Sequence, residues 1–114
     1  MEKKEQDRIV RRYYQYLKLE KGCSANTIDA YMRDLDKFLN FIKEEGKDFM
    51  TAQLEDMHNF SALMTDIGIN PVSLSRILSG IRSFYHFLVL GDIIDANPTE
   101  LLEFPKKPQH LPDV

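Results

Sequence analysis

The sequence predicts an all-α protein, and three observations support this fold class. Apolar residues recur at three- and four-residue spacing along most of the chain, which places them on one side of a helix. The alternation of β-branched and polar residues that is typical of strands does not occur. Most glycines and prolines stand at the ends of the periodic segments. We therefore expect one domain with four main helices and a short fifth.

A glycine separates the first two predicted helices. We expect the first helix over about residues 5–20, followed by Gly22 in the left-handed conformation that often ends a helix. The second helix is expected to begin after Ser24, a suitable N-cap, and to end near residue 45. The apolar residues expected to face inward are Ile9, Val10, Tyr13, Tyr16 and Leu17 in the first helix and Ile28, Tyr31, Met32, Leu35, Phe38, Leu39 and Ile42 in the second.

An Asn-Pro pair marks the start of the fourth predicted helix. The third helix is expected over about residues 51–67. Asn70 and Pro71 then serve as N-cap and first residue of the fourth helix, which ends at Gly91. A second Asn-Pro pair predicts a short helical turn within residues 97–104. The apolar residues expected inside are Leu54, Met57, Phe60, Leu63 and Met64 in the third helix and Leu74, Ile77, Leu78, Ile81, Phe84, Tyr85 and Leu88 in the fourth.

The last ten residues differ from the rest of the chain. Residues 105–114 contain three prolines and show no helical period, which predicts an extended linker. We expect residues 1–104 to form the helical domain and residues 105–114 to begin a linker to a further, absent domain. The chain is then a fragment cut at a domain boundary.

Composition limits the compartment and the chemistry. A single cysteine, Cys23, excludes an internal disulfide and fits a reducing compartment. The charged first residues lack the apolar core of a signal peptide, and no apolar run approaches the ~20 residues that span a bilayer. We expect a cytoplasmic protein without membrane contact. Because neither ligand-spaced histidines nor a phosphate loop occurs, we expect no catalytic residue, no cofactor and no metal site.

Charge is distributed unevenly along the chain. The net charge of −3 argues against nucleic-acid binding, which usually requires a basic surface. However, residues 48–70 contain acids and no Lys or Arg, whereas residues 71–91 contain Arg76 and Arg82 and no acid. This segregation predicts one electropositive face on an acidic molecule.

The polar face of the fourth predicted helix carries the strongest functional signal. A solvated helix face usually mixes Glu with Lys, but this face has arginines, serines and a glycine. Such a face suits close approach to a phosphodiester backbone. The alternative explanation is an ordinary solvent-exposed face that happens to lack acids. We expect the guanidinium groups of Arg76 and Arg82 to be exposed and free of carboxylate partners. The face consists of Ser75, Arg76, Ser79, Arg82, Ser83 and His86 around Gly80.

The second predicted helix offers a further anion contact at its start. Ser24, Asn26 and Thr27 lie where free backbone amides and the positive end of the helix dipole attract anions. Ordinary capping is an equally good explanation of the same residues. The polar side of the helix continues through Arg33 and Lys37.

Two long stretches resemble one known family. Residues 16–38 resemble the amino-terminal, SAM-like core-binding domain of tyrosine recombinases and integrases, and residues 75–88 match the same domain. The pair Asn97-Pro98 and the proline-rich stretch 105–112 fit it as well. Within the family the chain is most similar to the XerC/XerD type, and more to XerD.

The resemblance implies an architecture and a set of contacts. Domains of this family are four- or five-helix bundles of two crossed helical hairpins, and they form one jaw of a clamp on a recombination site. The second and fourth helices face the DNA major groove, and the catalytic domain lies beyond the linker. The positions that match DNA-facing positions of the family are Ser24, Asn26, Thr27, Arg33, Ser75, Arg76, Ser79, Arg82 and Ser83, and Lys106 and Lys107 match its linker lysines.

We therefore expect a module that binds double-stranded DNA for a site-specific recombinase, in chromosome dimer resolution at cell division or in DNA integration. The fragment itself is not expected to be an enzyme, and the family implies partner recombinase subunits that form a tetramer on the DNA. Two alternatives stay open. One is a helical protein-interaction domain that uses the acidic third helix, with Glu55 and Asp56, as its partner surface. The other is a stand-alone helix-turn-helix regulator.

Overall fold

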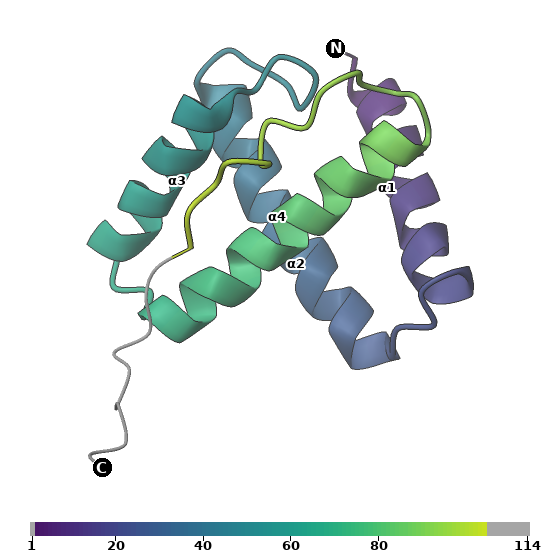
Figure 1. Cartoon of the computed structure of the whole chain (residues 1–114), viewed down its shortest axis with the longest axis horizontal. Helices are drawn as coiled ribbons and strands as arrows, with labels where there is room; N and C mark the ends of the chain where they lie inside the picture. Colours follow the sequence, from purple (N-terminus) through teal and green to yellow (C-terminus); the bar gives the residue numbers. More distant parts are fainter. Residues whose placement is uncertain (1, 105–114) are drawn as a thin grey trace.

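The computed structural model describes residues 2–104, which form four α-helices in two hairpins (Figure 1). The first hairpin consists of α1 (Lys3–Leu19) and α2 (Ala25–Glu44), and the second of α3 (Leu54–Asp66) and α4 (Pro71–Leu90). In Figure 1, α4 crosses over α2, and α1 and α3 lie on either side of the crossing. The predicted all-α fold class is confirmed. No helix within residues 2–104 is long and apolar enough to span a membrane.

The helix ends confirm the predicted capping residues. Gly22 has a φ of +62°, a left-handed conformation that favours glycine. The Ser24 hydroxyl accepts a hydrogen bond from the Thr27 amide at 3.2 Å, and the Asn70 side chain accepts one from the Ser73 amide at 2.9 Å. These bonds satisfy amides that lack a partner within the helix.

Three sequence predictions are wrong in detail. The helix α3 begins later than residue 51, because the Asp48 carboxylate accepts bonds from the amides of Met50 and Thr51 and closes a separate turn. Leu63, expected inside, is 40% exposed. The stretch 97–104 forms a turn, with the Leu102 amide bonded to the Thr99 carbonyl at 3.0 Å, and no fifth helix.

Aromatic rings dominate the core between the two hairpins. Phe84 on α4 lies at its centre and meets Tyr13 of α1 edge-on, with ring centroids 5.2 Å apart, and Phe49 at 5.5 Å. Edge-to-face pairs of this kind stabilise a core beyond the area that they bury. The largest fully buried side chains are Tyr13, Phe38, Phe49, Phe60, Phe84 and Tyr85.

A glycine lies at the crossing of α2 and α4. A Cβ atom at the buried Gly80 would meet the Tyr31 ring at 3.5 Å and the Tyr31 Cα at 4.0 Å. The Tyr13 hydroxyl also reaches the Gly80 carbonyl, at 3.4 Å. Because Gly80 has no side chain, α2 and α4 approach each other closely. The hydrogen bond of Tyr13 brings α1 to the same residue.

The buried tyrosines are packing residues, as their place on the apolar stripe predicts. The Tyr85 hydroxyl donates to the Phe49 carbonyl at 2.8 Å, and the whole side chain is buried. Burial raises the pKa of Tyr85 and of Tyr13 well above the usual value, because desolvation disfavours the phenolate.

The crossing is tested by graded substitution of Gly80. A Cβ atom at 3.5 Å is in ordinary van der Waals contact, so Gly80→Ala should fit and raise the free energy of unfolding by up to about 1 kcal/mol through its better helix propensity. Gly80→Val should lower it by about 1–3 kcal/mol, because the added methyl groups force α2 and α4 apart. Urea unfolding measures both changes. Equal effects of Ala and Val would contradict the close crossing.

Alkaline pH should destabilise the fold through the buried tyrosines. Their stabilising contribution is complete below pH about 10, the usual tyrosine pKa, and is lost as the pH rises, because only the unfolded chain releases the phenolic protons. Urea unfolding between neutral pH and pH about 11 measures the slope. Tyr85→Phe should flatten the slope, whereas Tyr14→Phe, at a residue that is 39% exposed, should leave it unchanged. Equal slopes in the wild type and Tyr85→Phe would contradict the assignment.

Candidate nucleic-acid interface

The two arginines of α4 lie at opposite edges of its polar face. Arg82 follows Arg76 by six positions, so at about 100° per residue their side chains diverge by about 120° around the helix axis. Arg76 reaches toward α2, and Arg82 reaches toward the segment that follows α4. Both residues are exposed, as expected.

Arg76 belongs to a small charged cluster between two helices. Its Nε lies 3.4 Å from Oδ2 of Asp34 on α2, and the Lys37 Nζ lies 3.7 Å from the other carboxylate oxygen. We call Asp34, Lys37 and Arg76 the α2–α4 seam. The Asp34 side chain is 2% exposed, whereas those of Lys37 and Arg76 are about half exposed. The expectation that Arg76 has no carboxylate partner is wrong, because the crossing brings an acid of α2 beside α4.

Arg82 is held by the chain that leaves α4. Its Nη2 donates to the Leu102 carbonyl at 3.1 Å, and its guanidinium carbon lies 4.4 Å from the centre of the Phe104 ring. A cation over an aromatic ring is attracted to the negative face of the ring. The guanidinium group is therefore oriented by the segment 102–104 while the residue remains exposed.

Polar side chains from three parts of the chain surround Arg82. They line a surface hollow of about 460 Å³ between the α1–α2 connection, α4 and the turn that follows it. Guanidinium, ammonium, hydroxyl and amide groups there are donors of the kind that bind phosphate oxygens. The hollow also contains one carboxylate, that of Glu100. Its lining residues are Lys21, Ser79, Arg82, Ser83, His86, Asn97 and Glu100.

The start of α2 uses its hydroxyl groups for capping. The Ser24 hydroxyl donates to the Thr27 hydroxyl at 2.9 Å and accepts from the Thr27 amide. Ordinary capping therefore accounts for both residues, and the neighbouring Asn26 is exposed. An anion contact at this end stays a prediction.

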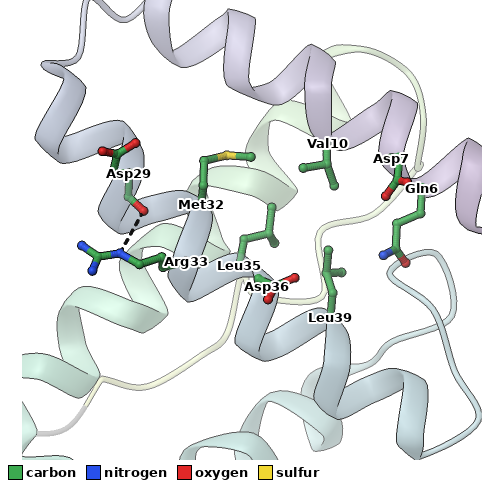
Figure 2. A pocket seen from close by; sticks show the side chains of 9 residues that line it. All are labelled: Gln6, Asp7, Val10, Asp29, Met32, Arg33, Leu35, Asp36 and Leu39. Carbon is green, nitrogen blue, oxygen red and sulfur yellow. Dashed lines mark hydrogen bonds between the residues drawn. The ribbon is translucent and has the colours of Figure 1, made fainter.

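Arg33 does not join the cations of α4. Figure 2 shows it on α2 beside a groove that lies between α1 and α2, where its Nε donates to the Asp29 carbonyl at 3.4 Å. The same groove is lined by the carboxylates of Asp7, Asp29 and Asp36. Arg33 thus lines a groove with three carboxylates, whereas Arg76 lies beside one carboxylate and near a second cation, Lys37.

Two further predictions concern Ser75 and the linker. Ser75 is half-buried and lies one helical turn before Ser79 on α4, so both serines face the same side. Lys106 and Lys107 lie outside the described residues, and their DNA contact stays a prediction.

The expected DNA contacts did not include two cations, Lys37 and Lys21, although Lys37 was placed on the polar side of the second helix. Lys37 stands three residues after Asp34, a spacing that places both on one side of α2 and that is readable in the sequence. Lys21 lies in the connection before α2, and only the tertiary fold brings it beside Arg82.

The protein-interaction alternative named two acids of α3, and the structure buries one of them. Asp56 is 4% exposed: one oxygen accepts the Gln53 amide at 2.8 Å, and Lys47 Nζ lies 3.0 Å from both oxygens. Of the two acids proposed for that surface, only Glu55 is exposed. Among residues 2–104, no three His, Cys, Asp or Glu side chains gather as a metal site would require.

These features define a small all-α domain with exposed arginines at its main helix crossing, and comparison with known proteins places it in a family. The family described as "Phage integrase, N-terminal SAM-like domain" matches residues 10–91. The chain belongs to this family. No solved structure matches the chain significantly.

The curated relatives are tyrosine recombinases of the XerC/XerD type. Tyrosine recombinase XerD of Oceanobacillus iheyensis is 34% identical over 90% of this chain and 35% of its own length. Tyrosine recombinase XerC of Pediococcus pentosaceus is 34% identical over 91% of this chain and 35% of its own. Tyrosine recombinase XerD of Staphylococcus saprophyticus is 38% identical over 95% of this chain and 37% of its own length. The chain thus spans about a third of the length of these relatives.

Asp56 provides a test that separates a structural acid from a surface acid. Asp56→Ala should lower the free energy of unfolding by about 1–3 kcal/mol, because it removes the N-terminal cap of α3 and leaves Lys47 without its partner. The adjacent, exposed Glu55→Ala should change it by less than about 0.5 kcal/mol. Thermal unfolding measures both, and similar values for the two variants would contradict the assignment.

Proposed function

We propose that this chain is the DNA-holding domain of a site-specific tyrosine recombinase. It binds double-stranded DNA through the exposed side of α4 and the adjoining part of α2, and strand exchange is carried out by residues outside this chain. Family membership and the similarity to XerC and XerD support the class of protein. Chromosome dimer resolution or DNA integration is the corresponding cellular role, in the cytoplasm at the nucleoid and with partner recombinase subunits on the same DNA.

The observation that carries the proposal is the clustering of exposed cations around α4. Arg76 and Lys37 lie at the α2–α4 seam, and Lys21 and Arg82 line the hollow on the other side. Four cations from three parts of the chain therefore flank the serines of α4, although the whole chain carries a net charge of −3. Contacts of this kind bind the phosphate backbone and fix the register of a protein on the duplex.

The proposed face carries little sequence information by itself. Lysines and arginines that contact phosphates bind all sequences alike, whereas discrimination requires contacts to base edges in the groove. The serines on the polar face of α4 are the side chains best suited to contact base edges, since a hydroxyl can donate to or accept from any of them.

Loss of both α4 arginines should weaken DNA binding without unfolding the domain. Phosphate contacts release counterions, so log affinity falls as log salt rises, and each lost contact makes this slope less steep by about 0.9. The double variant R76A/R82A should therefore reduce its magnitude by about 2. Fluorescence anisotropy with a short labelled duplex, titrated at several low salt concentrations, measures affinity and slope.

The matched control removes the same charge elsewhere. Arg8 and Arg11 are exposed on the outer side of α1, away from Ile9 and Tyr13, which face the core. The double variant R8A/R11A should retain the wild-type salt slope. Equal losses in the two double variants, or binding by the wild type that is insensitive to salt, would contradict the proposed face.

A further inference from the structure

Asp34 is the most unusual polar residue of the domain. It is 1% exposed although it carries a carboxylate, and its Oδ2 accepts no hydrogen bond from any residue between 2 and 104. A buried carboxylate is costly unless cations compensate it. The nearest cations are those of Arg76, 3.4 Å away on α4, and Lys37, 3.7 Å away on α2.

The location of this acid is unexpected for a surface that binds DNA. An anion beside two phosphate-binding cations weakens their long-range attraction for DNA. A purely attractive face would have a neutral residue here, since Asp34 caps no helix end and lies within α2. The position of a buried acid between two exposed cations therefore points to a role that involves those cations.

We propose that Asp34 is a positioning residue of the DNA-binding face. Its carboxylate fixes the Arg76 guanidinium and the Lys37 ammonium at the α2–α4 seam, so that one cation from each crossed helix is presented to the same stretch of phosphate backbone. This inference rests on the proposed function and adds to it a residue that does not itself touch DNA.

The geometry favours positioning over simple neutralisation. Arg76 contacts Asp34 through Nε, on the inner edge of the guanidinium, and its side chain remains 54% exposed. A guanidinium group carries five N–H donors, so the outer nitrogens stay free to donate to a phosphate while the inner one faces Asp34 in an ion pair. Holding a long side chain in place before binding reduces the entropy that is lost when it contacts a ligand.

Replacement of Asp34 by Asn tests the inference through the sign of its effect. The variant changes the net charge from −3 to −2 and nearly preserves shape, so electrostatic attraction alone would make DNA binding tighter. Positioning predicts the opposite: affinity about three- to tenfold weaker at low salt, because Arg76 and Lys37 lose their anchor. Anisotropy with the labelled duplex measures affinity, and amide spectra of the isotope-labelled protein establish that the variant is folded.

The control makes the same chemical change on the same helix. Asp36 is exposed and lies in the groove between α1 and α2, where its carboxylate accepts from Asn40. Asp36→Asn should leave DNA affinity unchanged or slightly increased. An equal loss of affinity in both variants would overturn the inference.

A double-mutant cycle tests whether Asp34 acts through Arg76. In the Arg76→Ala background, Asp34→Asn should cost much less affinity than in the wild type, because the group that it positions is gone. A fully additive loss would overturn the inference.

If the Asp34→Asn variant does not fold, Arg76→Lys provides a second test of the positioning role. Lysine keeps the charge and can pair with Asp34, but it cannot face Asp34 with one nitrogen and donate to a phosphate with others, so positioning predicts weaker binding than the wild type, whereas attraction alone predicts wild-type affinity.

The two proposals fail in different ways. If the wild-type chain shows no salt-dependent DNA binding, the proposed function fails, and the role of Asp34 fails with it. If the wild type binds and R76A/R82A weakens binding, but Asp34→Asn binds equally or more tightly, only the positioning role is overturned.

Discussion

The close crossing of α2 and α4 is the constraint on which the rest of the structure depends. Because Gly80 has no side chain, Tyr31 packs directly against the backbone of α4, and the Tyr13 hydroxyl brings α1 to the same point. The crossing joins the two hairpins, buries the aromatic core between them and places Asp34 beside Arg76. A wider separation of the helices would therefore change the core and the charged seam together.

Much of the fold was predictable from local signals. Ser24, Asn70 and Gly22 act within one or two turns of the chain, so their roles as helix ends can be read from the residues alone. The errors occur where another local interaction competes with helix formation. Asp48 forms its own turn and delays α3, and Asn97 bonds to Thr99 in place of starting a fifth helix.

The candidate site was only partly predictable, because a helix period assigns residues to a face but not to neighbours. It placed Arg76 and Arg82 on the exposed side of α4 correctly, yet Asp34 reaches Arg76 from another helix, and Leu102 and Phe104 reach Arg82 from beyond the helix end. Arg33 differs from these two, because Asp29 and Asp36 of its groove lie within one turn of it on α2, and only Asp7 comes from another helix. Contacts between elements distant in sequence decide the surroundings of Arg76 and Arg82.

The division of the α2–α4 seam between two hairpins has a thermodynamic consequence. Lys37 comes from the first hairpin and Arg76 from the second, so no unfolded or half-assembled chain presents them side by side. Any polyanion that engages both cations binds the native state alone and shifts the folding equilibrium toward it. Binding of a polyanion at the α2–α4 seam and the folding stability of the bundle are therefore thermodynamically linked, so a change in one changes the other.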